Sequence, residues 1–173
     1  MTAVHELMSR RPVTVSPTTS VAELLSLFGR HGYNALPVVE PEGRLVGVVS
    51  KLDLLRPFVM GRRRPSSVEE VSAIAADIMQ RKVVSVEAQE SIIDAGRLML
   101  VTSLRSLPVI HRRSRSARPE LVGMVSRGDL LRGLGFPVKG GAHRSPTRAS
   151  VRQEPSMRDG TLALARLAVT SAG

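Results

Sequence analysis

One segment of nine residues occurs twice in this chain. GVVSKLDLL, at residues 47–55, returns as GMVSRGDLL at residues 123–131. Upstream of the two segments, residues match at a constant spacing of 71, as Met8, Pro37 and Val38 match Met79, Pro108 and Val109. The spacing is 76 at the repeated segment itself, so the second copy carries five extra residues before its glycine. A unit that is used twice usually buries its apolar face against the other copy, and we expect that arrangement here.

The composition limits how such a pair is stabilised and where it works. Of the 173 residues, 42% are hydrophobic, yet there is no Trp, one Tyr and three Phe, so the core must be aliphatic. The absence of Cys excludes disulfides, thiolate metal ligands and a cysteine nucleophile. No stretch approaches the ~18 apolar residues of a spanning helix, and the first residues lack the apolar block of a secretion signal. We therefore expect a cytoplasmic protein that does not contact the membrane.

The two copies show the same order of predicted elements. A short β-type segment comes first, and the helix after it begins at a Ser that an acidic residue follows three positions later, which is typical of a capping box. Two strands and a closing helix follow. The expected starts are Val13, Ser20, Leu36, Leu45 and Ser50 in the first copy and Val83, Ser91, Leu107, Leu121 and Ser126 in the second. This β-α-β-β-α order, used twice, predicts an α/β (α+β) fold whose repeats pack about a pseudo-two-fold axis.

The same pattern divides the chain into four parts. We place the first repeat at 1–57, a linker at 58–74, the second repeat at 75–133 and a tail at 134–173. Residues 69–79 look helical and lead into the second repeat. The tail is basic and contains Gly and Pro without a sustained hydrophobic period, so we expect it to be disordered.

The repeated Gly-apolar-apolar-Ser-x-x-Asp motif is the segment best suited to bind a ligand. Gly47 and Gly123 lie in apolar strands, where a missing side chain often indicates the close approach of another group. The Ser and Asp that follow would open a helix, whose free amides favour a phosphate. A carboxylate in that first turn can accept hydrogen bonds from both hydroxyls of a ribose. The same spacing is also a helix cap that needs no ligand, and the motif alone leaves both interpretations open.

The ordered set of segments resembles a tandem pair of cystathionine-β-synthase (CBS) domains, the arrangement called a Bateman module. The resemblance covers residues 4–57 and 75–133. It rests on VHELMSRRPVTVSPTTSVAELL, NALPVV and LVGVVSKLDLL in the first copy, and on AADIMQRKVVSVEAQESIIDA, RSLPVI and LVGMVSRGDLL in the second. It implies two clefts between the repeats, each able to hold an adenosine-containing ligand such as AMP, ADP, ATP or S-adenosylmethionine.

The resemblance also implies roles for residues at matching positions. The Ser and Asp of each closing motif would face the ribose, and the basic residue after each Ser, Lys51 or Arg127, is a candidate phosphate contact. Each motif would share its cleft with base-pocket residues of the other copy. The first cleft would combine Ser50 and Asp53 with Leu104, Arg105, Ser106 and Pro108. The second would combine Ser126 and Asp129 with Val13, Thr14, Tyr33, Asn34, Ala35 and Pro37. Val84 is a further base-pocket candidate.

The resemblance implies a regulatory module rather than an enzyme. Nucleotide binding would change the packing or the oligomeric state of the repeats, and an unidentified protein partner would receive that change. Because two such modules commonly associate, we expect a homodimer. The four His residues lack metal-ligand spacing, so we expect no metal and no other cofactor.

Two other functions stay open at this point. The net charge of +10 fits a nucleic-acid-associated protein, although few aromatic residues are available to stack on bases. Alternatively, the chain is a ligand-free interaction scaffold whose Ser-Asp pairs only cap helices.

Overall fold

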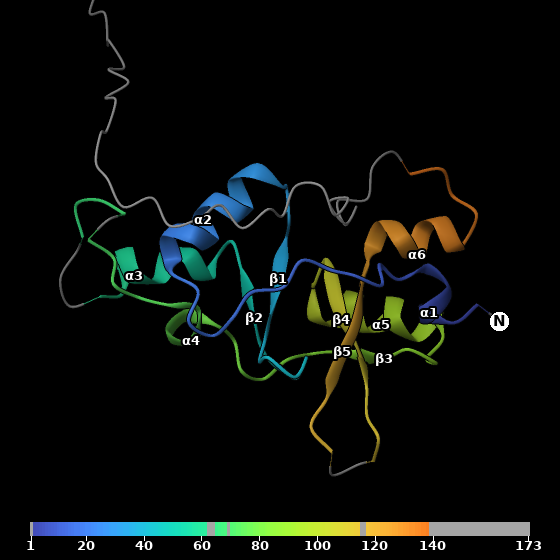
Figure 1. The fold of residues 1–173 in the computed structure, drawn as a ribbon. Helices are drawn as coiled ribbons and strands as arrows, with labels where there is room; N and C mark the ends of the chain where they lie inside the picture. The colour runs from blue at the N-terminus through green and yellow to red at the C-terminus, as the bar shows by residue number, and fades with distance from the viewer. Residues whose placement is uncertain (1, 62–64, 69, 115–116, 139–173) are drawn as a thin grey trace, which may run out of the picture.

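Two lobes, each with a small sheet and covering helices, make up the fold in Figure 1. The computed structural model describes residues 2–61, 65–68, 70–114 and 117–138. The first lobe contains α2 (Val21–Arg30), β1 (Ala35–Val39), β2 (Leu45–Ser50), the 3-10 helix η1 (Asp53–Leu55) and α3 (Arg56–Val59). The second contains β3 (Val86–Glu87), α5 (Ile92–Thr102), β4 (Ser106–His111), β5 (Glu120–Ser126) and α6 (Arg127–Gly133). Two further turns of helix, α1 (Val4–Leu7) and α4 (Ala75–Ile78), lead into the repeats.

The predicted α/β fold of two repeats is confirmed, and the two hairpins share one register. In the β1–β2 hairpin, Ala35 lies opposite Ser50 and Val38 opposite Gly47. The β4–β5 hairpin repeats these pairs with Ser106 opposite Ser126 and Val109 opposite Gly123. β3 extends the second sheet in parallel with β4. Its counterpart in the first repeat is reduced to one isolated parallel bridge between Val15 and Val38.

The Ser residues expected to start the two long helices do so. The Oγ of Ser20 accepts a hydrogen bond from the backbone N–H of Glu23 at 3.2 Å, and the Oγ of Ser91 accepts one from Asp94 at 3.1 Å. The helix expected over 69–79 is much shorter, because residue Ile74 is extended and forms an antiparallel bridge with Ser20.

The closing helix of the first repeat also differs from its expected form. α6 is a continuous helix that Ser126 caps, whereas the first repeat has η1 followed by α3. Pro57 has no N–H with which to bond the Asp53 carbonyl four residues back. The N–H of Arg56 bonds that carbonyl instead, three residues back, which tightens the turn into a 3-10 helix.

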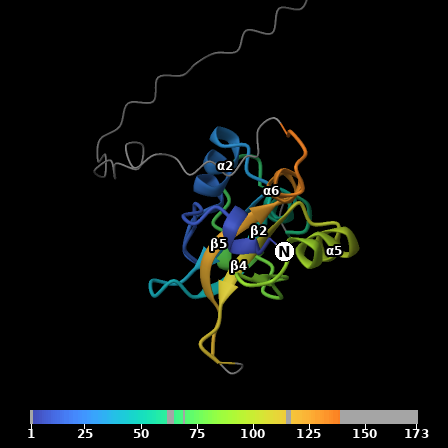
Figure 2. The ribbon, with the colours of Figure 1, turned by 90° about the vertical axis from the view of Figure 1, so that its right-hand side faces the viewer.

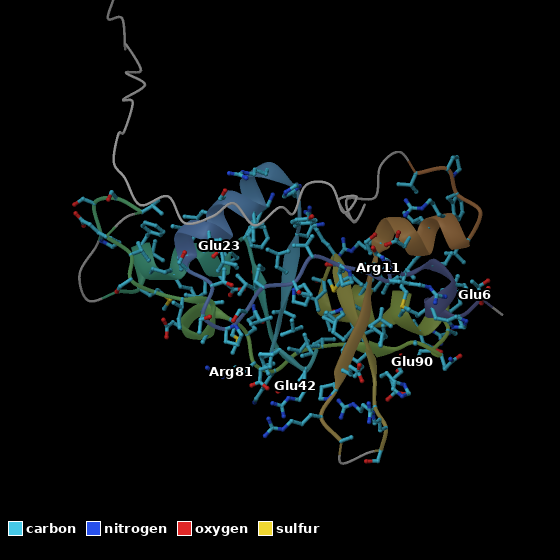
Figure 3. All side chains as sticks on the ribbon, viewed as in Figure 1. Glu6, Arg11, Glu23, Glu42, Arg81 and Glu90 are labelled. Carbon is cyan, nitrogen blue, oxygen red and sulfur yellow. The ribbon has the colours of Figure 1, made fainter. Side chains whose placement is uncertain are left out.

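Each repeat completes its core with the helical turn that precedes the other repeat. Val4 of α1 is fully buried in the second repeat's hydrophobic cluster with Ile92 and Leu107. Ala75 and Ile78 of α4 are buried in the first repeat's cluster. Figures 1 and 2 show α1 beside α6, and Figure 3 shows Glu6 of α1 at the same end of the molecule as Glu90. The two repeats therefore exchange their leading segments rather than only stacking two finished faces.

The exchange of leading segments explains why both motifs contain a glycine. A Cβ atom on Gly47 would overlap the Met79 Sδ, and one on Gly123 would lie 2.7 Å from the Met8 Sδ and 2.8 Å from the Ser9 carbonyl oxygen. The close approach that the glycines indicated is therefore made by the other repeat's leading segment.

Backbone hydrogen bonds hold each leading segment in place over its glycine. The residues that follow the two Met pair with the residues that follow the two Gly. Gln80 and Val48 exchange hydrogen bonds of 2.9 and 3.1 Å, and Ser9 and Met124 exchange bonds of 2.8 and 3.0 Å.

The expected tail at 134–173 lies outside the described residues from position 139 onward. Among the helices that the structure describes, none combines the length and apolar character needed to cross a bilayer.

We expect Gly47→Ala and Gly123→Ala each to lower the free energy of unfolding by about 1–3 kcal/mol, because each methyl group overpacks the exchanged segment. The two variants should differ in how much of the lost stability a second substitution restores. Met79→Ala should recover much of the loss at position 47, where the nearest atoms belong to that side chain. Met8→Ala should recover less at position 123, because the Ser9 carbonyl stays in place. Urea denaturation followed by circular dichroism measures both double-mutant cycles, and equal recovery would contradict this packing.

Candidate functional site

Asp53 is a buried carboxylate that accepts four hydrogen bonds. Its residue is fully buried. The Oδ2 atom accepts from the backbone N–H of Ser50 at 2.8 Å and from the Ser50 hydroxyl at 2.7 Å. The Oδ1 atom accepts from the Arg56 Nε at 3.1 Å and from the Gln80 Nε2 at 3.4 Å. Gln80 belongs to the leading segment of the second repeat, so this network joins the two repeats.

Asp129 repeats the arrangement with one partner fewer. Its Oδ2 atom accepts from the Ser126 N–H at 2.7 Å and from the Ser126 hydroxyl at 2.6 Å. Its Oδ1 atom accepts from the Arg132 Nη2. The Asp129 side chain is 10% exposed, compared with 1% for Asp53.

Only the second motif is a helix cap in this structure: Ser126 caps α6, and Ser126 and Asp129 form a capping box, with the Asp129 N–H donating to the Ser126 hydroxyl at 3.3 Å. Ser50 and Asp53 make the same reciprocal hydrogen bonds, with the Asp53 N–H donating to the Ser50 hydroxyl at 3.4 Å, but Leu52 is the residue that precedes η1. Each Asp is also paired with an Arg three residues further on. Ionised carboxylates tolerate burial when charge-assisted hydrogen bonds replace the lost water. What the arrangement offers a ligand is the outer oxygen, Oδ1, because Oδ2 is committed to the preceding Ser.

The register of each hairpin determines which predicted site residues lie side by side. In a hairpin, the end of the second strand lies beside the start of the first, so Ser50 pairs with Ala35 and Ser126 with Ser106. The Arg127 N–H likewise donates to the Arg105 carbonyl at 3.1 Å. Each Ser-Asp motif thus lies beside the base-pocket candidates of its own repeat. Hairpin neighbours do not test which residues a bound ligand would contact, so the expected pairing of each motif with the base-pocket residues of the other repeat stays a prediction.

The remaining predicted residues occupy three kinds of environment. Thr14, Asn34 and Arg105 are exposed, Val13 and Val84 are half-buried, and Pro37 and Pro108 are buried. Leu104 is 37% exposed. Tyr33 is buried in the first repeat's hydrophobic cluster, and this burial raises the pKa of its phenol.

The two candidate phosphate contacts are not equivalent. Lys51 is exposed. Arg127 folds back over its own repeat, where its guanidinium donates to the carbonyls of Leu104 at 2.9 Å and Ser103 at 3.0 Å. Arg127 therefore braces the loop before β4, a contact that its position after the Ser did not indicate.

Three residues of these hydrogen-bond networks were not among the site residues predicted from the sequence. Arg56 and Arg132 stand three positions after their Asp in both copies of Asp-Leu-Leu-Arg, and an ion pair at that spacing is a detectable helical signal. Gln80 carries no such signal, because its contact with Asp53 depends on the exchange of leading segments.

Two of the cavities on the described residues are lined by residues outside the Ser-Asp motifs. One, of about 530 Å³, lies beside the linker between Pro57 and Ala73. The other, of about 390 Å³, lies where the repeats meet and is lined by Arg44, Arg81 and Arg118 among others. Figure 3 places Arg81 near Glu42 at this edge. In the described part of the chain, no cluster of three His, Asp or Glu side chains is placed to hold a metal ion.

The paired hairpins, the closing motifs and the duplicated topology define a tandem CBS-domain pair. The chain belongs to the CBS domain family, which matches residues 4–59 and 75–135. The CBS domain-containing protein YhcV of Bacillus subtilis is 34% identical over 131 residues, which cover 75% of this chain and 84% of YhcV.

Solved structures of CBS pairs share the fold. CBSX2 in complex with AMP is 29% identical, with a TM-score of 0.64, covering 78% of this chain and 96% of CBSX2. The CBS domain pair of protein MJ0100, in complex with 5′-methylthioadenosine and S-adenosyl-L-methionine, is 24% identical, with a TM-score of 0.60 and coverage of 78% and 97%.

We expect Asp53→Ala to lower the free energy of unfolding by about 2–3 kcal/mol, because buried donors lose their acceptor. Asp94→Ala is the matched control. Asp94 also follows a capping Ser and pairs with an Arg three residues on, but its side chain is 58% exposed. Its loss should be under about 1 kcal/mol. Urea denaturation followed by circular dichroism compares the two variants, and equal losses would show that burial of the Asp53 network adds no stability.

Proposed function

We propose that this protein is a regulatory module that binds an adenosine-containing ligand between its CBS repeats and passes a change in their packing to a protein partner. The observation that carries the proposal is the pair of buried carboxylates, Asp53 and Asp129, at the starts of the two closing helices. Support comes from CBSX2, a CBS pair of 29% identity whose structure contains AMP. The ligand classes that fit the family resemblance are AMP, ADP, ATP and S-adenosylmethionine. No catalytic step is assigned to the chain.

Ribose would bind by replacing the Arg at the outer carboxylate oxygen. The two ribose hydroxyls are donors, and Oδ1 of Asp53 or Asp129 is the acceptor that the preceding Ser does not use. Arg56 and Arg132 are 53% and 42% exposed, so their guanidinium groups can turn into water, and the ribose hydroxyls would replace the hydrogen bonds that the buried carboxylates lose. Once displaced, each guanidinium stays close enough to face a ligand phosphate, together with exposed Lys51 in the first repeat.

The base-pocket assignment follows the register of the hairpins. Ala35 and Pro37 lie on the strand beside Ser50, and Ser106 and Pro108 on the strand beside Ser126. We keep Val13, Thr14, Tyr33, Asn34, Val84, Leu104 and Arg105 as proposed contributors to the two pockets.

A ligand bound at a closing motif would affect how that repeat packs against the other repeat. α6 begins at the Ser126 motif and packs against α1, the leading segment of the first repeat. Gly133 of α6 lies so close to Leu7 of α1 that an added Cβ atom would overlap the end of the Leu7 side chain, so a shift of α6 toward α1 would displace that side chain. A ligand that binds one packing of the repeats better than another would shift the population between them.

Isothermal titration calorimetry and thermal unfolding of the full chain with each of the four ligands test the proposal. A ligand at one hundred times its dissociation constant should raise the free energy of unfolding by about 2.7 kcal/mol. The double variant Asp53→Asn/Asp129→Asn should stay folded, because the amide oxygen of Asn can still accept from the N–H and hydroxyl of the preceding Ser, and should lose ribose recognition. If none of the four ligands produces a response, the ligand-free interaction scaffold is favoured. Unchanged binding by the variant would show that the carboxylates only cap helices.

We further propose that two chains associate as a homodimer through the ends of the closing helices. Apolar side chains are exposed there in both repeats, with Val59 at 64%, Met60 at 78%, Leu134 at 49% and Phe136 at 59%. Their occurrence at equivalent ends of both repeats would let a second chain cover both groups at once and form a larger apolar contact.

Sedimentation velocity should give the mass of a dimer for the natural chain and of a monomer for Val59→Glu/Phe136→Glu. The surface variant Gln89→Glu, in an exposed loop, is the control and should stay dimeric. A monomeric natural chain, or a dimer that persists in the double variant, would contradict this interface.

A further inference from the structure

We infer that the two closing motifs are not equivalent, and that the chain binds one adenosine-containing ligand, at Asp129, while Gln80 closes the matching position at Asp53. This inference rests on the proposed function and adds to it the site and the number of ligands bound. Three differences between the repeats support it.

The first difference is how many hydrogen bonds each carboxylate already accepts. A carboxylate offers about four lone-pair sites. Asp53 uses four, with Ser50 contributing two and Arg56 and Gln80 one each. Asp129 accepts three among the described residues. A ribose must therefore displace two donors at Asp53 but only Arg132 at Asp129.

The second difference is how firmly the blocking group is held. Arg132 reaches Asp129 from an exposed position on its own helix. Gln80 is part of the exchanged leading segment, and its backbone makes two hydrogen bonds to Val48. Gln80 is exposed as well, but this backbone anchor keeps its amide within reach of Asp53, to which it donates at 3.4 Å, and the Asp53 side chain is only 1% exposed. The equivalent position in the other repeat is Ser9, whose side chain is two bonds shorter.

The third difference is an unsatisfied hydroxyl beside Asp129. Ser106 is 6% exposed, and its Oγ has no hydrogen-bond partner. Directly opposed residues of an antiparallel pair project to the same face, so this hydroxyl lies on the face of Ser126. A buried polar group without a partner is rare in proteins, and a ligand that supplies one would satisfy it. The matching residue in the first repeat is Ala35, which has no hydroxyl.

Calorimetric titration of the full chain with AMP and with S-adenosylmethionine tests the inference through stoichiometry. We expect one ligand per chain. Asp129→Asn should weaken that binding at least about tenfold, as expected when a hydrogen bond to a charged group is lost. Ser106→Ala, which introduces the residue of the other repeat, should weaken it by roughly threefold to tenfold.

Gln80→Ser should open the second position and raise the stoichiometry to two. The double variant Asp129→Asn/Gln80→Ser should then bind one ligand, at Asp53. Gln89→Ser, the same change in an exposed loop, is the matched control and should leave one site.

The outcomes separate this inference from the proposed function. Two ligands per natural chain, or a site of natural affinity that survives Asp129→Asn, would overturn the inference and leave the proposed function standing. The absence of heat and of thermal stabilisation with every adenosine ligand would overturn both.

Discussion

The fold depends on the contact between a methionine of one repeat and a glycine of the other. Met79 lies over Gly47, and Met8 lies over Gly123, so closely that an added Cβ atom would overlap the Met side chain unless that side chain shifted. The backbone pairs beside these contacts fix the leading segments in place. Because α1 and α4 then supply buried residues to the opposite repeat, neither repeat has a complete core alone. The two repeats therefore form one folded unit in which each repeat depends on the other for its core.

The same contact positions the chemistry of the site. The glycine strands end at Ser50 and Ser126, where the closing turns begin and their carboxylates become buried. The leading segment that covers the glycine also ends near the carboxylate, which is how Gln80 reaches Asp53. In the proposed site, the two oxygens of one carboxylate would have different roles: Oδ2 accepts from the Ser at the start of the closing turn, and Oδ1, which pairs with an Arg, would accept from the ligand. A site built in this way can be folded and capped before any ligand arrives.

Small differences between equivalent positions make the repeats chemically distinct. In the first repeat Pro57 follows a 3-10 turn and lies in the short helix α3, whereas in the second repeat Gly133, at the matching position, is the last residue of the continuous helix α6. Gln80 replaces Ser9, and Ala35 replaces Ser106. Each of these residue differences alters hydrogen-bond donors or acceptors near a carboxylate. The shared strand register is not disturbed, because it is set by backbone pairing and by the glycines.

The sequence by itself determined the duplication, the β-α-β-β-α order, the Ser starts of the helices and the two Ser-Asp motifs, since all of these are written in local spacing. It also indicated that some group must approach the two glycines. Only the tertiary structure decided which group that is, because Met8 and Met79 are far from their glycines in the chain. The tertiary structure likewise shortened the helix expected over 69–79, through the pairing of Ile74 with Ser20. It grouped the site residues by hairpin register and brought Gln80 to Asp53. Contacts between distant segments depend on how whole repeats pack, and no local pattern encodes that packing.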